Sequence, residues 1–404
     1  MITGHAITHR FIGSINDFLI SLVLLAIFLF LIIRFIKKNN LNLKIVFGLI
    51  IYRLLFLLFL IFYAAKSGTF DGHGIYNAAG PQFEETLIGY NLKQFTGSFF
   101  LSILIRPLVE YLNLSYISVS LIFLYFGTFG ILFCYSIYNK LNNESNYIKI
   151  FIIAFCFNPA LNIFTVSITK DTIIFFLIMY LFYIYFVEQL NLKKLLYYSI
   201  IPVGLIFFIR PYIGGIMLAS FFPYYISNLK GFNIRILIKL ALIIVLVIFT
   251  FYISRNLYAW NHDGNLIEQF KNFIFARQNN TNVGNTILNY NQGEILIRFI
   301  QSIFGFGVYK SGFLAPVFLY DQILSIYLFL LIILVKLNNF SNFKKLYFHD
   351  YEFLKYFIIY ALFAYFICSI SLSNFGLILR LKWMYWPIIT FFILSLLSKH
   401  EKKA

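Results

Sequence analysis

The sequence predicts an all-α, polytopic integral membrane protein with about eleven transmembrane helices. The 404-residue chain is 61% hydrophobic and only 12% charged, and its mean hydropathy is +0.83. Apolar runs of about 17–25 residues, the length that crosses a bilayer, recur along its whole length. We expect one integral membrane domain over residues 1–404, with two long outer-face loops at about 65–114 and 254–315, and interfacial helices.

Each span is predicted from an apolar run between polar or basic residues. The third contains Gly127 and Gly130, which allow close helix contact, and the fourth contains Asn158–Pro159. Arg53 is the only charge expected deep within a span, and the stretch 98–113 is expected to lie in the interface. The eleven spans are 16–33, 44–64, 115–138, 147–164, 172–187, 195–209, 212–227, 236–253, 316–335, 354–370 and 383–397.

The distribution of Lys and Arg predicts the orientation. Most of them fall in the loops on the side of the membrane opposite the two long loops. Basic residues in short loops mark the cytoplasmic side. The N-terminus is therefore expected outside, the C-terminus in the cytoplasm and both long polar loops outside. No cleavable signal peptide is expected, because no small-residue cleavage site follows the first apolar run.

Several function classes are disfavoured. The net charge of +17 comes from basic residues scattered at span ends, so no nucleic-acid partner is expected. The three cysteines fall within apolar runs and are read as buried small hydrophobes. His73 and His262 lack partners at metal-ligand spacing. Without a phosphate-binding glycine motif, a nucleotide-using enzyme is not expected, and we expect no cofactor and no metal site.

The polar stretch 65–97 departs most from the composition of the chain. It carries Asp71, His73, Glu84 and Glu85 directly after an apolar run of membrane-spanning length. Asp71, with Tyr76 five residues later, is a candidate for acid/base chemistry on a lipid-borne substrate. The plainer alternative is a solvated loop with an Asp at a helix start.

The predicted topology places several further charged residues at the same outer surface, namely Lys170, Asp171, Arg210, Arg277, Arg380 and Lys382. Cations there would neutralise a polyprenyl pyrophosphate and stabilise it as a leaving group, while a carboxylate would deprotonate an attacking hydroxyl. The alternatives are that the basic residues reach to lipid headgroups, and that Asp171 interacts with a helix dipole.

At these residues the chain resembles bacterial surface-polysaccharide polymerases of the Wzy/EpsG type, which are related in architecture to GT-C membrane glycosyltransferases. The segments that carry the resemblance are GTFDGHGIYNAAG (68–80), NPALNIFTVSITKDTIIFFLIMYLFY (158–183) and SNFGLILRLKWMYWP (373–387). The chain lacks the Asp-Asp or Glu-Asp doublet that some GT-C families carry at the position of Asp71.

The resemblance implies a GT-C-like enzyme in the bacterial cytoplasmic membrane that polymerises undecaprenyl-pyrophosphate-linked oligosaccharide repeat units at the outer face. Asp71 would be the general base, with Asp171 as the alternative base. Tyr76, Lys170, Arg210, Arg277, Arg380 and Lys382 would bind substrate. Membrane lipid, a chain-length regulator and a flippase of the same pathway are the implied partners.

Two other functions stay open. A GT-C glycosyltransferase would add a single sugar from a polyprenyl-phosphate donor. A polysaccharide-precursor flippase or transporter would favour inverted repeats and charges in the middle of spans, for which the sequence gives little sign.

Overall fold

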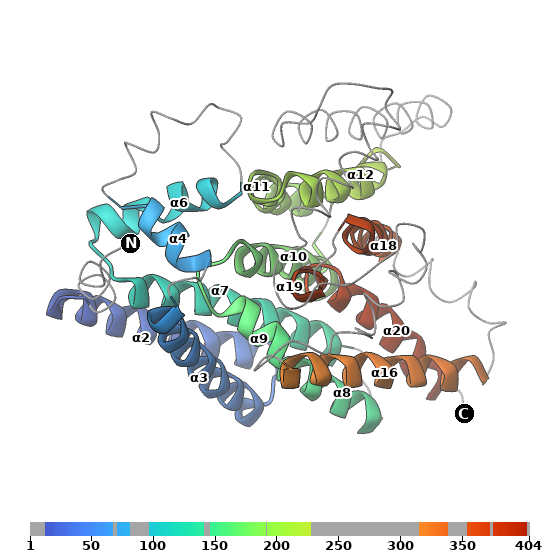
Figure 1. Cartoon of the computed structure of the whole chain (residues 1–404). Helices are drawn as coiled ribbons and strands as arrows, with labels where there is room; N and C mark the ends of the chain where they lie inside the picture. Colours follow the sequence, from blue (N-terminus) through green and yellow to red (C-terminus); the bar gives the residue numbers. More distant parts are fainter. Residues whose placement is uncertain are drawn as a thin grey trace. The chain divides into compact units, whose positions relative to one another are not determined.

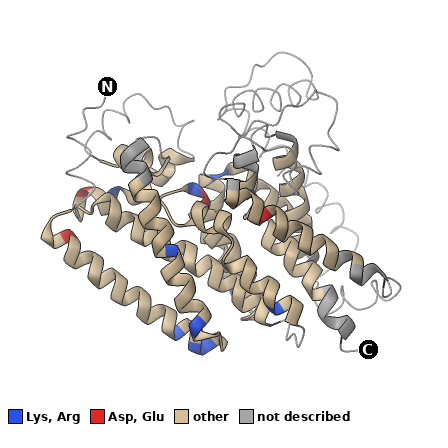
Figure 2. Ribbon diagram, turned by 60° about the horizontal axis from the view of Figure 1, so that its bottom comes forward, with Lys and Arg blue, Asp and Glu red and all other residues tan. Residues whose placement is uncertain are grey.

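The computed structural model describes residues 13–67, 71–80, 97–140, 146–190, 192–227, 315–337, 354–371 and 375–401. Every regular element within these ranges is helical, as the sequence predicts. The described ribbon is poor in charge, and its Lys, Arg, Asp and Glu residues lie mostly near helix ends (Figure 2).

Contacts divide the chain into two compact units. Unit 1 comprises Met1–Lys140 and Leu161–Arg210, and unit 2 comprises Leu141–Ala160 and Pro211–Ala404. The chain therefore passes from unit 1 to unit 2, back to unit 1, and again to unit 2. The expectation of one integral membrane domain over 1–404 stays a prediction.

Unit 1 is built around the pair of α7 (Tyr116–Asn139) and α10 (Lys170–Phe186), whose contact is the most extensive between any two described helices (Figure 1). A Cβ at Gly130 of α7 would lie 2.6 Å from the Phe175 ring of α10. The missing side chain thus lets the two helices approach closely, as expected. The helices α2 (Ile15–Asn39) and α3 (Leu43–Ser67) also pack on α7.

The ends of the α2 helix are tied to other parts of unit 1. The Asp17 carboxylate accepts hydrogen bonds from Ser115 N (2.9 Å) and Ser118 Oγ (2.6 Å) at the start of α7. At its other end, Lys38 Nζ lies 2.7 Å from Glu188 Oε1, just after α10. Burial raises the pKa of Glu188, but hydrogen bonds from Lys38 and Tyr183 and the nearby positive charges outweigh that effect and lower it overall.

Unit 1 also contains the expected outer-face region and its neighbours. α4 (Asp71–Ala78) begins at Asp71, α6 (Ser98–Arg106) follows, and a π-helical turn, η2 (Pro107–Tyr111), comes next. α4 packs on α6, and α6 on α11 (Leu192–Ile209). The expected interfacial stretch 98–113 is helical from Ser98 to Tyr111, and its place in an interface stays a prediction.

Unit 2 contains α8 (Asn146–Cys156), α12 (Pro211–Ser227), α16 (Ala315–Leu337), α18 (Leu354–Ser371), α19 (Phe375–Lys382) and α20 (Trp386–Glu401). α18 packs on α12 and α20, while α16 packs on α20 and α8. α9 (Pro159–Thr165) joins the units, because its first two residues belong to unit 2 and the rest to unit 1.

The expected fourth span is broken at Asn158–Pro159 into α8 and α9. Proline suits the first turn of a helix, where its missing N–H would have no partner within the helix. The Asn158 side chain accepts a hydrogen bond from Ala160 N at 2.8 Å, as an N-cap residue does.

The membrane assignment is supported at a coarser level than eleven spans. Within the described residues, four stretches are long and apolar enough to cross a membrane: Ile15–Asn39, Leu43–Phe62, Tyr116–Asn139 and Asn146–Thr165. Five more apolar helices are shorter. The eighth expected span, 236–253, lies outside the described residues, and the total of eleven stays a prediction. Large apolar side chains such as Phe30 (64%) and Phe62 (75%) are exposed, which suits contact with lipid.

Candidate functional site

The start of α4 packs against the segment that precedes α10. A Cβ built at Gly72 would lie 2.8 Å from the Ile168 carbonyl oxygen and 3.0 Å from the Tyr116 hydroxyl. Only glycine therefore permits this approach. The start of α4, which begins at Asp71, thus contacts the segment that directly precedes Lys170 and Asp171, and the Asp71 side chain lies outside the described residues.

Tyr76 has a different environment from the one predicted. Its side chain is buried, its hydroxyl donates to the Leu114 carbonyl oxygen at 2.8 Å, and its ring meets Tyr116 edge to face. These contacts hold α4 on the segment before α7. Tyr76 thus helps to place Asp71, and its hydroxyl is already engaged by the backbone.

The N-terminus of α10 is formed by hydroxyl side chains. Thr169 is the N-cap, and its Oγ1 accepts from Thr172 N at 3.3 Å. Thr172 Oγ1 donates to the Ser167 carbonyl oxygen at 2.9 Å, and Thr169 Oγ1 donates to the Phe164 carbonyl oxygen at 3.2 Å. These bonds satisfy backbone groups that the change from α9 to α10 would otherwise leave unpaired.

An ion pair joins the start of α10 to the end of α11. Asp171 Oδ1 accepts from Arg210 Nη2, and only 3% of the Asp171 side chain and 11% of the Arg210 side chain are exposed. Asp171 also lies in the first turn of α10, where the helix dipole favours a negative charge. A carboxylate held in this way orients the guanidinium and is poorly placed to take up a proton.

A tight backbone turn lies next to this pair. Gly97 has φ +71°, its N–H donates to the Phe208 carbonyl oxygen at 3.1 Å, and a Cβ there would lie 3.9 Å from Lys170 Nζ. The turn thus lies beside two cationic groups, Lys170 and Arg210, and one carboxylate, Asp171. Among the described side chains named here the charge is net positive, which suits an anionic ligand.

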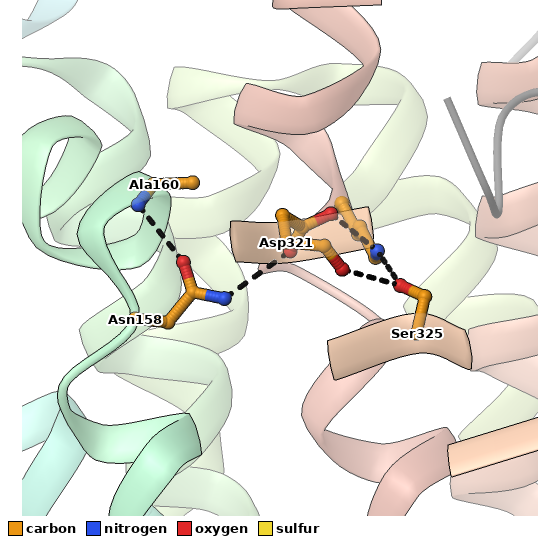
Figure 3. A network of polar contacts seen from close by, with 5 residues as sticks. Asn158, Ala160, Asp321 and Ser325 are labelled. Carbon is orange, nitrogen blue, oxygen red and sulfur yellow. Dashed lines mark hydrogen bonds and ion pairs between the residues drawn. The ribbon is translucent and has the colours of Figure 1, made fainter. Parts of the chain in front are cut away.

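A second polar network lies in unit 2, away from water. Lys382 Nζ donates to Asp321 Oδ2 at 2.7 Å and to Ser325 Oγ at 2.8 Å, and Asn158 Nδ2 donates to Asp321 Oδ1 at 3.3 Å (Figure 3). Lys382 also lies 4.4 Å from the centroid of the Trp386 ring. Burial lowers the pKa of Lys382, and the Asp321 carboxylate opposes that shift. The network connects α16 with the break before α9 and with the end of α19.

The structure brings together part of the predicted set. Lys170, Asp171 and Arg210 meet in unit 1, where Asp71 opens α4. Arg380 is half-buried on α19 of unit 2, and the Lys382 ammonium is enclosed by Asp321 and Ser325 rather than presented to a substrate. Arg277, with His262 and the rest of the second long loop, lies outside the described residues.

The sequence did not reveal that two acids, Asp321 and Asp17, belong to polar clusters. The expectation that Arg53 is the only charge deep in a span is wrong, because Asp321 (1% exposed) lies within α16. Asp17 (6% exposed) is also buried, in the first turn of α2. An apolar helix tolerates a carboxylate when neighbouring helices supply donors, as Lys382 and Asn158 do for Asp321. A single acid inside the apolar run 316–335 was the available signal.

In the ranges that the structure covers, no group of three or more His, Cys, Asp or Glu side chains could hold a metal ion. In comparisons with known proteins, no family model, no curated protein and no solved structure matches this chain.

Proposed function

We propose that this protein is a membrane glycosyltransferase that polymerises polyprenyl-pyrophosphate-linked oligosaccharide repeat units at the outer face of the membrane. The observation that carries the proposal is the cluster in unit 1, where Lys170 and the Asp171–Arg210 pair lie beside the Gly97 turn and close to the start of α4. A cationic site within apolar helices suits a phosphate group attached to a lipid.

Each residue has one task in this proposal. Arg210 and Lys170 bind the diphosphate and stabilise the charge that develops on it as the glycosidic bond breaks. Asp171 orients Arg210 through their ion pair. Asp71 accepts the proton of the sugar hydroxyl that attacks the anomeric carbon. The new glycosidic bond forms as the bond to the diphosphate breaks, and the lipid pyrophosphate leaves.

The test uses the purified protein in liposomes with lipid-linked repeat units from the host cells. The wild type should produce a ladder of chain lengths. Asp71→Asn keeps the size of the side chain but cannot take up a proton, so we expect activity to fall by about 10²-fold or more. Arg210→Lys should retain part of the activity of the wild type and more than Arg210→Ala, because Lys keeps the charge without the two-pronged geometry.

A glycine pair supplies a matched control for the placement of Asp71. Gly72→Ala would push α4 away from the Ile168 carbonyl, whereas a Cβ at Gly74 meets nothing within 4 Å. Gly72→Ala should lower activity and Gly74→Ala should leave it unchanged. Equal activity of both variants, or a normal ladder from Asp71→Asn, would contradict the proposed site.

Two other functions are separated by the same material. A single-sugar transferase would use a polyprenyl-monophosphate sugar and give one addition instead of a ladder. A transporter is favoured by one observation, the buried Asp321–Lys382 pair beside the broken helix α8–α9, since such features mark transport sites in membranes. Movement of the lipid-linked sugar across the liposome without chain growth would identify that activity.

A further inference from the structure

Arg53 is a fully buried cation whose hydrogen bonds within the described residues all go to neutral oxygen atoms. Its Nε donates to Thr128 Oγ1 at 2.9 Å, and its Nη1 donates to Asn162 Oδ1 at 2.9 Å and to Thr165 Oγ1 at 3.0 Å. Its Nη2 donates to the Thr165 carbonyl oxygen at 2.6 Å. Within the described part of the chain, no carboxylate contacts it. An arginine inside an apolar helix is costly, so its partners indicate what it does.

The sequence has a glycine where Arg53 needs space. A Cβ at Gly127 would lie 1.9 Å from the Thr165 carbonyl oxygen and 2.3 Å from Arg53 Nη2. Any larger residue would separate α7 from the end of α9. Arg53 on α3, Gly127 on α7 and Thr165 on α9 therefore form one close-packed junction within unit 1.

The junction fixes one end of a buried, non-helical segment. α9 ends at Thr165 and α10 begins at Lys170, and the residues between them are buried. Arg53 binds the carbonyl of Thr165, which is the last residue of α9. Thr169 and Thr172 fix the other end through their bonds to the carbonyl groups of Phe164 and Ser167.

The same segment supports the proposed site. Its Ile168 carbonyl meets Gly72 at the start of α4, and Lys170 and Asp171 follow it directly. A shift of the Thr165 carbonyl would therefore displace the Ile168 carbonyl from Gly72 and would also move Lys170 and Asp171. We infer that Arg53 is a positioning residue, which fixes the segment 166–169 and thereby places Lys170, Asp171 and the start of α4 for the reaction. This inference rests on the proposed function for its catalytic part.

A cysteine at position 167 provides a readout that does not depend on activity. Ser167 is 1% exposed, and its hydroxyl makes no hydrogen bond within the described chain, so Ser167→Cys is a mild change. The native Cys134 of α7 is buried to the same degree and serves as an internal reference for global unfolding. Labelling of each cysteine by a membrane-permeant maleimide is measured by mass spectrometry of its peptide.

We expect Cys at 167 to react slowly beside Arg53. In Arg53→Met the reaction should be about tenfold or more faster, because several buried hydrogen bonds are lost and the segment opens locally. Cys134 should keep its rate. Arg53→Lys should give an intermediate rate, since it keeps the charge but loses the two-pronged contact with Thr165.

The transferase assay supplies the second readout. Arg53→Met should lower kcat with a small effect on KM, and Arg53→Lys should restore part of kcat. Protection of Cys at 167 in Arg53→Met, or an unchanged kcat in an active enzyme, would overturn the inference. If Arg53→Met exposes Cys134 as well, Arg53→Lys becomes the test. The inference then requires the cysteine at position 167 to react faster in Arg53→Lys than beside the native Arg53, while the rate of Cys134 stays the same.

The proposed function and the positioning role of Arg53 can be refuted independently. Faster labelling at position 167 in a protein that transfers no sugar would support the role of Arg53 in fixing the segment and refute the proposed function. Chain growth that is unaffected by Arg53→Met would support the proposed function and refute the role of Arg53.

Discussion

Replacing Lys382 by methionine would leave the Asp321 carboxylate buried without its cation. Both side chains are 2% exposed, and the Nζ–Oδ2 distance is 2.7 Å. Removing one partner of a buried ion pair destabilises proteins by about 3–5 kcal/mol, because the remaining charge loses its compensation. Asn158 would still donate to Asp321, so we expect Lys382→Met near the lower end of this range, about 3 kcal/mol.

The double variant Asp321→Asn/Lys382→Met removes both charges and keeps the approximate volumes. Neutral replacements of buried pairs are often harmless or stabilising, so it should be more stable than either single variant. The coupling obtained from the cycle should be about 2–3 kcal/mol, a magnitude typical of residues in direct contact.

The assay is thermal unfolding in detergent, followed as loss of the monodisperse protein after heating. Lys149→Met is the matched control, because Lys149 lies exposed on α8 and forms no ion pair with a described residue. A midpoint for Lys382→Met equal to that of the control, or additive effects in the double variant, would refute the reasoning about the buried pair.

Three further outcomes are expected. A reporter fused at Lys403 should behave as cytoplasmic and one inserted at Asn279 as external; the same side for both would contradict the predicted topology. Gly127→Ala should lower the amount of folded protein in membranes because its Cβ would overlap neighbouring atoms, whereas Gly204→Ala, which meets nothing within 4 Å, should not; equal amounts would contradict this packing. Folding lowers the pKa of Glu188, so its contribution to the free energy of unfolding is present above its ordinary pKa of 4.5 and is lost as the pH falls through the lower folded value. Acid unfolding scans of Glu188→Gln should lack this loss, which is about 0.2–1 kcal/mol for a partly exposed pair.

The sequence predicted well what depends on local pattern. Long apolar runs gave helices because a membrane requires backbone groups to be paired within each segment. The break at Asn158–Pro159 was not predicted, because the fourth span was expected to continue through it, although proline cannot continue a helix without losing a hydrogen bond. A helix start at Lys170 and Asp171 was one of the two alternatives for these residues, because the dipole at a helix N-terminus favours an aspartate, and α10 begins at Lys170.

What depends on distant contacts could not be predicted. Asp321 and Lys382 are 61 residues apart, and neither residue alone shows that the other compensates its charge. The engagement of the Tyr76 hydroxyl by the Leu114 carbonyl likewise depends on packing between separate elements. The sequence therefore grouped basic residues by side of the membrane, whereas the structure separates Lys382, which is enclosed, from Arg210, which pairs at the start of α10.

The alternation of the two units along the chain has a consequence for biosynthesis. α8 belongs to unit 2, yet the remainder of unit 1, from Leu161 to Arg210, is made before the helices on which α8 packs. At about 5–20 residues per second, α16 emerges roughly 10–30 s after α8. During that interval α16, on which α8 packs, has not yet been made, and Asn158 cannot yet donate to Asp321. Neither unit can be obtained alone by truncating the gene at one point, because each unit is made of two separate stretches of the chain.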